Sequence, residues 1–358
     1  MLRLASSEYR AVPRGFRPDL TRLIGQTLRL AAVVAALTSL AVGFTDPRVQ
    51  RALEPVPALR PATEASIHRL QVADDGRTVW VTSSPGRLRN VDLATGRVLI
   101  DLFVPEGLSP APLCTADGFQ VMFLSHGGQP LVQRLDYEDG PVALRRERTD
   151  LIDRFAINPG GDRIVLQSNE ALELCSGTGP DRRHVIVTQD RRCSALAWAP
   201  DGTQLLVAEE DGWLSLRDGR TLAELARIPS QIECGVRAGW SQDGRFALAF
   251  GVSGPIAVWD THSPAASPRH LEFECRSAAA LSPDGSQLAV CDTERQFWLI
   301  NVADPSDRFC LDRLPASANA ICYTPGGDRL LVGTMNGDLL CWSLLEERLL
   351  WTSGPGKS

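Results

Sequence analysis

Cysteine is the residue type in this chain that is best suited to metal or redox chemistry, and it occurs nine times. No two cysteines have the C-x-x-C spacing of a zinc site or of a thioredoxin-type centre. An odd number of cysteines does not make a complete disulfide framework, which argues against an oxidising compartment. Three of them, Cys193, Cys234 and Cys275, recur at intervals of 41 residues. This regular interval indicates a repeated structural unit that places the three thiols alike.

The other residues with catalytic potential form no known motif. The five histidines make no H-E-x-x-H pair, and the chain has no G-x-S-x-G, no P-loop and no G-x-G-x-x-G opening a helix. The segment Asp260-Thr261-His262 is interpreted as a capped loop rather than a catalytic dyad. Asp150 and Asp153 lie close together, but the other repeats have no matching acids. We therefore predict no catalytic residues, no cofactor and no metal.

A turn signal occurs seven times in the chain, at spacings of 41 to 43 residues. Each copy ends in a glycine within segments such as "WAPDG", "LSPDG" and "YTPGG". The seven glycines are Gly76, Gly118, Gly161, Gly202, Gly244, Gly285 and Gly327. A repeat of 40–45 residues with this turn is typical of one four-stranded blade of a β-propeller.

Apolar side chains alternate at period two on both sides of each turn, which predicts two paired strands. Leu196 and Trp198 precede Gly202, and Leu205 and Val207 follow it. In these turns proline presets φ, aspartate accepts local backbone hydrogen bonds and glycine adopts the left-handed conformation.

A second hairpin follows in most repeats, with Asp211-Gly212 and Asn336-Gly337 as its clearest turns. A third strand and a less regular fourth strand complete the unit. The last repeat includes its own fourth strand at about residues 348–352, so we expect the ring to close by packing. A strand from residues 58–64 that completes the last blade is the alternative.

The dipeptide Trp259-Asp260 ends the predicted third strand of the fifth repeat, and here the chain resembles the WD-repeat β-propeller family. The same position in other repeats holds Val91-Asp92, Cys175-Ser176, Arg217-Asp218, Ile300-Asn301 and Trp342-Ser343, and Leu135-Asp136 lies nearby in the second repeat. The resemblance covers about residues 65–353. It implies an all-β fold, a seven-bladed propeller of four-stranded antiparallel blades. The family's glycine–histidine pair is missing, so we expect its His–Ser/Thr–Trp–Asp hydrogen-bond network to be absent or rewired. Lactonase-like bacterial propellers share much of the pattern.

WD-like topology places the loop before each first strand and the turn between the second and third strands on one rim. The rim residues that we expect to bind a protein partner are Arg191, Arg192, Glu210, Trp213 and Met335. Cys193, Cys234 and Cys275 would begin the innermost strands and line one sector of the central channel. They are either a soft-metal or redox site or, as we favour, small residues at a crowded position; several other cysteines are expected to be buried apolar side chains.

Residues 30–44 form an uncharged, apolar segment, preceded by a leader whose net charge is +4 over residues 1–29. This arrangement predicts an N-terminal hydrophobic helix that anchors the protein in a membrane. A cleaved signal or a soluble segment are the alternatives. The arginine distribution favours a cytoplasmic leader and an extracytoplasmic propeller. Residues 45–64 are a proline-rich linker, 65–353 the propeller and 354–358 a tail.

The remaining chain carries the negative charge, since the whole protein has a net charge of −6. Nucleic-acid binding requires a basic surface, so we expect no nucleic-acid partner. The sequence favours a non-enzymatic protein-interaction platform tethered to a membrane. A hydrolase or lactonase-like enzyme acting at the channel mouth is the alternative, and a sensor or assembly factor that binds envelope peptides is a variant of the first hypothesis.

Overall fold

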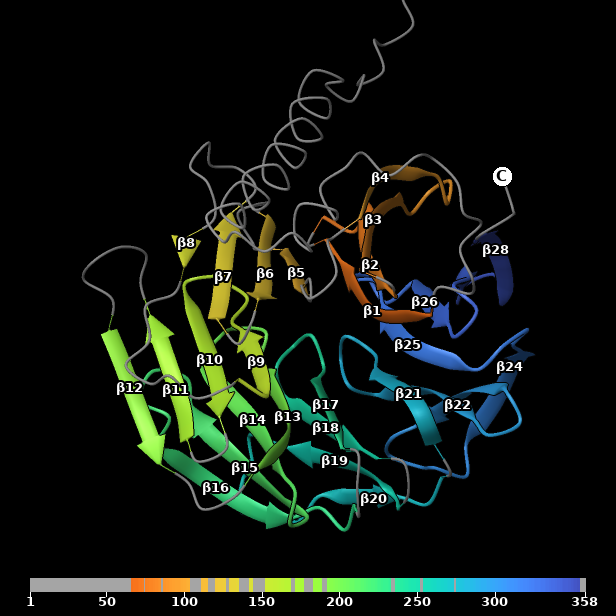
Figure 1. The fold of residues 1–358 in the computed structure, drawn as a ribbon. Coiled ribbons are helices and arrows are strands. Elements are labelled where there is room, and N and C mark those ends of the chain that lie inside the picture. Colours follow the sequence, from red (N-terminus) through yellow and green to blue (C-terminus); the bar gives the residue numbers. More distant parts are fainter. Residues whose placement is uncertain are drawn as a thin grey trace, which may run out of the picture.

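The computed structural model describes residues 66–354, except for 74, 85, 104–110, 115–119, 127–128, 135–141, 144–151, 169–170, 177–182, 189–191, 233–235, 252–253 and 274. The described strands form seven four-stranded antiparallel sheets arranged around a centre (Figure 1). We number them sheet 1 to sheet 7 in chain order. For sheet 2 the structure describes the strands but not the side chains. The prediction of an all-β fold built from repeated four-stranded antiparallel sheets is confirmed.

Each sheet consists of four consecutive strands in sequence order. Sheets 1 to 3 contain β1 (Ile67–Val72), β2 (Thr78–Ser83), β3 (Arg87–Asp92), β4 (Val98–Phe103); β5 (Ala111–Cys114), β6 (Gln120–His126), β7 (Gln129–Arg134), β8 (Val142–Ala143); and β9 (Arg154–Ile157), β10 (Arg163–Ser168), β11 (Ala171–Ser176), β12 (Arg183–Thr188). Sheets 4 and 5 contain β13 (Cys193–Trp198), β14 (Gln204–Glu209), β15 (Trp213–Asp218), β16 (Glu224–Pro229); and β17 (Arg237–Trp240), β18 (Phe246–Phe250), β19 (Ile256–Asp260), β20 (Arg269–Leu271). Sheets 6 and 7 contain β21 (Cys275–Leu281), β22 (Gln287–Asp292), β23 (Gln296–Asn301), β24 (Arg308–Arg313); and β25 (Ala318–Tyr323), β26 (Arg329–Thr334), β27 (Leu339–Ser343), β28 (Arg348–Ser353).

The first strand of each sheet lies innermost, and the turn that follows it is built as the sequence predicts. The six turn glycines in the described residues all have positive φ, between +64° and +74°. In sheet 6 the Gly285 amide donates to the Ser282 carbonyl at 2.9 Å, and the Ser286 amide donates to the Asp284 carboxylate at 3.0 Å. Hydrogen bonds from the Ser282 hydroxyl and from Ser286 lower the pKa of Asp284. The seventh turn glycine, Gly118, lies outside the described residues.

The third-strand dipeptides occupy the positions that the repeat predicts. Six third strands end at these dipeptides, namely β3, β11, β15, β19, β23 and β27. Their polar residues cap the following turn: Asp218 accepts hydrogen bonds from the amides of Arg220 and Thr221, and the Asn301 side-chain oxygen accepts one from the Ala303 amide. Trp259 is fully buried, and its indole N–H has no hydrogen-bond partner in the described part of the chain. Leu135-Asp136 lies outside the described residues.

Where the side chains of a sheet and of both its neighbours are described, both faces of that sheet are buried, as in sheet 5. On β18, Ala247 and Ala249 pack into an apolar cluster shared with sheet 4, whereas Leu248 and Phe250 pack into one shared with sheet 6. Because side chains alternate across a strand, consecutive residues enter different interfaces. The hydrophobic core is therefore a series of layers between sheets.

Sheet 7 contacts sheet 1, and it contains its own fourth strand, β28. Their shared apolar cluster includes Leu331 and Cys341 from sheet 7 and Ile67 and Val79 from sheet 1. The Leu93 carbonyl accepts hydrogen bonds from Arg329 at 2.7 Å and from the Trp351 indole at 3.1 Å. The first and last sheets are thus joined by packing and side-chain hydrogen bonds, as predicted.

The predicted N-terminal helix over residues 30–44 lies outside the described residues, as does the alternative closing strand at 58–64. In the part of the chain that the structure describes, no helix combines the length and the apolar character needed to cross a membrane.

Substitution of Gly244 by alanine should lower the free energy of unfolding. Its φ of +74° is a left-handed conformation that costs an L-residue about 1–2 kcal/mol. Gly239 in the same sheet is the matched control, since its φ is not in this region and a Cβ there would meet no atom within 4 Å. Gly239→Ala should leave stability unchanged or raise it by about 0.5–1 kcal/mol. Denaturant unfolding of both variants measures the difference, and equal midpoints would contradict the turn assignment.

Candidate interaction surfaces

Two surfaces of the described residues are candidates for binding a partner. The first is the rim that the sequence predicts, formed by the loop before each first strand and the turn between the second and third strands. Backbone hydrogen bonds join these two segments in sheet 1 (Ser84 to Ser66), sheet 4 (Glu210 to Arg192) and sheet 7 (Met335 to Ser317). The predicted sharing of one rim by these segments is therefore correct.

The structure brings together only some of the predicted rim residues. The Glu210 amide donates to the Arg192 carbonyl at 2.9 Å, Trp213 begins β15 of the same sheet three residues later, and all three residues are exposed. Met335 is 53% exposed but belongs to sheet 7, so it is not part of the same group. Arg191 lies outside the described residues.

Trp213 is also part of an ion-pair network in sheet 4. The Arg227 guanidinium lies 4.8 Å from the centroid of the Trp213 ring and donates to the carboxylate of Glu209, which is only 4% exposed. Arg217 approaches the same carboxylate at 3.9 Å. Trp213 thus covers a structural ion pair, which the sequence did not indicate because its members lie on three different strands.

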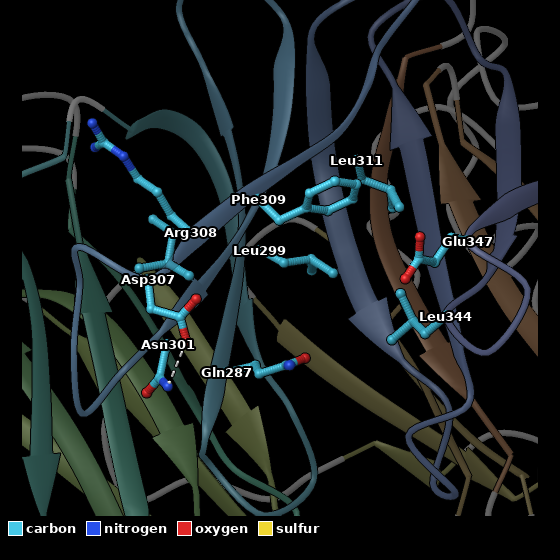
Figure 2. Close-up of a pocket in the computed structure, with 10 residues that line it drawn as sticks. Gln287, Leu299, Asn301, Asp307, Arg308, Phe309, Leu311, Leu344 and Glu347 are labelled. Atoms are coloured by element: carbon cyan, nitrogen blue, oxygen red, sulfur yellow. Dashed lines mark hydrogen bonds between the residues drawn. The ribbon is translucent and has the colours of Figure 1, made fainter.

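The second candidate surface is a groove on the outer side of the ring, between sheets 6 and 7 (Figure 2). Its apolar wall is formed by Leu299 on β23 and by Phe309 and Leu311 on the outermost strand β24. The other wall is the turn before β28, which supplies Leu344 and Glu347. We call these five residues, together with the polar side chains at the groove's end, the outer groove.

The outer groove leaves a large aromatic side chain in contact with solvent. Phe309 is 52% exposed, and Figure 2 shows its ring beside Leu311 and facing Leu344 and Glu347. At the other end the Asn301 amide donates to Asp307 at 3.1 Å. The cavity volume is about 270 Å³, slightly below the usual range of small-molecule pockets. The groove therefore suits one or two apolar side chains of a partner better than a whole cofactor.

The sequence did not reveal the outer groove. Phe309 belongs to an irregular fourth strand, where the period-two pattern is weak. The aromatic residue in the segment "RFCLDR" was the available sequence signal. It could not predict a groove, because the opposite wall of the groove comes from the next sheet.

The cysteines do not form the predicted channel site. Cys193 and Cys275 begin β13 and β21, as predicted, but they are 1% and 3% exposed and lie in two separate apolar clusters. The prediction that they line the channel is wrong for these two, because their side chains point into interfaces between sheets. Cys234 lies outside the described residues. The structure describes no group of three or more histidine, cysteine, aspartate or glutamate side chains placed to hold a metal.

The expectation that cysteines act as small buried apolar residues is confirmed for Cys175, Cys193, Cys275, Cys291 and Cys341. Burial raises the pKa of Cys322 to about 12 and that of Cys341 to about 11. Both thiols are therefore protonated at neutral pH, which makes them poor nucleophiles and poor metal ligands.

Comparison with known proteins supports the fold alone. No family model matches the chain, and no curated protein matches it by sequence. Among solved structures it is similar to the β-propeller domain of Cps50 (Swd1) from Myceliophteria thermophila, with a TM-score of 0.62 and 13% identity. The match covers 80% of this chain and 99% of that domain. With the repeated sheets, this likeness shows a β-propeller fold.

Replacing Arg227 by alanine should destabilise the protein more than replacing Trp213. Loss of Arg227 leaves the buried Glu209 carboxylate with a weaker ion pair, which should cost about 1–3 kcal/mol. Loss of Trp213 removes a partly exposed cation–π contact, which should cost about 0.5–1 kcal/mol. Urea unfolding of both variants tests this order, and the reverse order would show that Trp213 has the larger structural role.

Proposed function

We propose that this protein is a non-enzymatic interaction platform of the WD-repeat type. Its seven sheets form the seven blades of one closed propeller, and its partners are other proteins. The proposal is supported by the propeller fold, by the seven repeats of the sequence and by the contact between the first and last sheets. A rigid ring of this kind presents loops and edges of varied chemistry, and function on such a fold lies in these surface sites.

The outer groove is the observation on which the proposal rests most. Exposed large apolar side chains that gather beside a groove are typical of protein-binding sites. Leu345, at 85% exposed, follows Leu344 in the turn that forms one wall of the groove, so apolar surface continues beyond it. We propose that a partner segment inserts apolar side chains against Phe309, Leu311 and Leu344, with its polar groups at Asp307 and Glu347.

Burial of the exposed half of Phe309 would contribute substantially to affinity. Full burial of such a side chain is worth about 1.5–3 kcal/mol, so the exposed half corresponds to roughly a tenfold change in affinity. Interfaces depend strongly on a few anchors of this kind.

The substitution Phe309→Glu should weaken capture of a partner about tenfold or more while leaving the fold intact. The measurement is quantitative affinity capture with the full chain as bait, followed by mass spectrometry, with circular dichroism to check folding. Leu225→Glu is the control, because Leu225 is 51% exposed on the outermost strand of sheet 4, far from the groove along the ring. The proposal fails if both variants retain the wild-type set of partners.

The rim residues of sheet 4 are a second proposed contact. Arg192 and Glu210 make only a backbone hydrogen bond to each other among the described interactions, so their charges are open to a partner. Charge reversal of Arg191 and Arg192 in the same capture experiment tests whether partner binding depends on the rim independently of the groove.

We also propose that residues 30–44 anchor the propeller in a membrane, with the propeller on the extracytoplasmic side. The support is the apolar, uncharged composition of this segment behind a basic leader. The full chain should remain with membranes in high salt and be released by detergent, whereas a variant without residues 30–44 should be soluble. Protease added to intact cells should degrade the propeller. Recovery of the full chain in the soluble fraction would contradict the membrane anchor. Protection of the propeller from protease would indicate the opposite orientation.

A further inference from the structure

The exposed side chains on the described innermost strands are all histidine or arginine. They are His68, Arg69, Arg154 and Arg237, on β1, β9 and β17. Elsewhere on these strands the described side chains are buried or half-buried, and most are apolar. Among the described residues, the inner surface of this acidic protein therefore displays basic groups.

The three arginines occupy the same register position in alternate sheets. Each lies seven residues before the turn glycine, and each pairs with the corresponding residue of the second strand: Thr82, Gln167 and Phe250. In sheets 4 and 7 the equivalent positions hold Ala195 and Ala320. Equivalent register places the arginines at one level around the centre, with small residues at the same position in sheets 4 and 7.

Contacts of Arg237 show that side chains near this level connect sheets 5, 7 and 1. Arg237 in sheet 5 donates to the backbone carbonyl of Asn319 in sheet 7 at 2.9 Å and to its side-chain oxygen at 3.1 Å. The Asn319 amide group in turn lies 3.0 Å from the imidazole of His68 in sheet 1. A Cβ on Gly239, two residues after Arg237, would meet no atom within 4 Å. The space in front of β17 is therefore open.

None of the three arginines has a carboxylate partner among the described residues. Arg154 donates to the Cys193 carbonyl at 3.1 Å and forms no ion pair with its neighbour Asp153. The Arg69 guanidinium has no hydrogen bond or ion pair in the part of the chain that the structure describes. Burial lowers the pKa of Arg69 although its side chain contacts solvent. Both properties are expected of a cation in a solvent-filled channel enclosed by protein.

We propose that this end of the central channel binds a multiply charged oxyanion through Arg69, Arg154 and Arg237. Arginine presents several N–H donors in a planar fork that matches phosphate and carboxylate oxygens. An enclosed channel lined by one sign of charge concentrates ligands of the opposite sign. Three cations that have no counter-charge among the described residues favour a ligand with at least two negative charges, which is the chemistry of a phosphate group. Burial and the Arg237 charge lower the pKa of His68, so its imidazole is neutral at pH 7 and can contribute a hydrogen bond.

The test is calorimetric titration of the purified full chain with inorganic pyrophosphate and with a phosphoserine peptide. Wild-type protein should bind at least one of them, and Arg69→Gln and Arg154→Gln should each raise the Kd about tenfold, since each removes charge-assisted hydrogen bonds. Arg348→Gln is the control, because Arg348 lies on the outermost strand β28 and forms an ion pair with Glu346 in the turn before it. This variant should bind like the wild type.

Arg69→Gln should also fold normally, because Arg69 has no partner to lose among the described residues. Without ligand its melting temperature should equal or exceed that of the wild type, since a cation near other cations is removed. Binding of pyrophosphate would indicate a free anion as ligand, and binding of the peptide alone would indicate a phosphorylated group on a partner; either supports the site. Failure of both probes to bind, or equal binding by the wild type and the channel variants, would overturn it.

Discussion

A four-stranded sheet of this protein, such as sheet 5, has two apolar faces, and a sheet cannot bury either face within itself. Burial requires a neighbouring sheet on both sides, which the ring provides. Two of the largest fully buried side chains, Trp259 and Trp342, lie in these layers. Because this burial is the main favourable term in folding, no sheet is stable without its neighbours, and the whole ring follows from that constraint.

Directed hydrogen bonds fix how neighbouring sheets sit against one another. The indoles of Trp198 and Trp240, at equivalent positions of the repeat, donate to backbone carbonyls of the preceding sheet, Ala156 and Ala197. At the junction of the first and last sheets, the Leu93 carbonyl accepts hydrogen bonds from the Arg329 guanidinium and the Trp351 indole. The apolar layers stabilise the fold, and these hydrogen bonds fix the position of each sheet relative to its neighbour. The ring is therefore a rigid support for the residues at its surfaces.

Chemical character differs between the surfaces of this support. The outer groove is apolar with an acidic edge, the rim of sheet 4 carries mixed charges, and the inner strands display arginines. Groups that face a neighbouring sheet, such as Cys193, are buried and cannot contact a ligand or partner. Position relative to the sheet interfaces, rather than residue type, decides which side chains can bind a partner.

The sequence by itself determined the repeat, its turns and its strands. These features depend on local chemistry: left-handed glycines such as Gly244, caps such as Asp218 and alternation at period two all act within a few residues. Tertiary structure decided which residues meet. Phe309 of sheet 6 faces Leu344 of the neighbouring sheet 7, and Arg237 of sheet 5 contacts Asn319 of sheet 7. The Cys275 side chain points into an interface between sheets instead of the channel. These contacts join residues of different repeats, and the direction in which a side chain points is not encoded in the spacing along the chain.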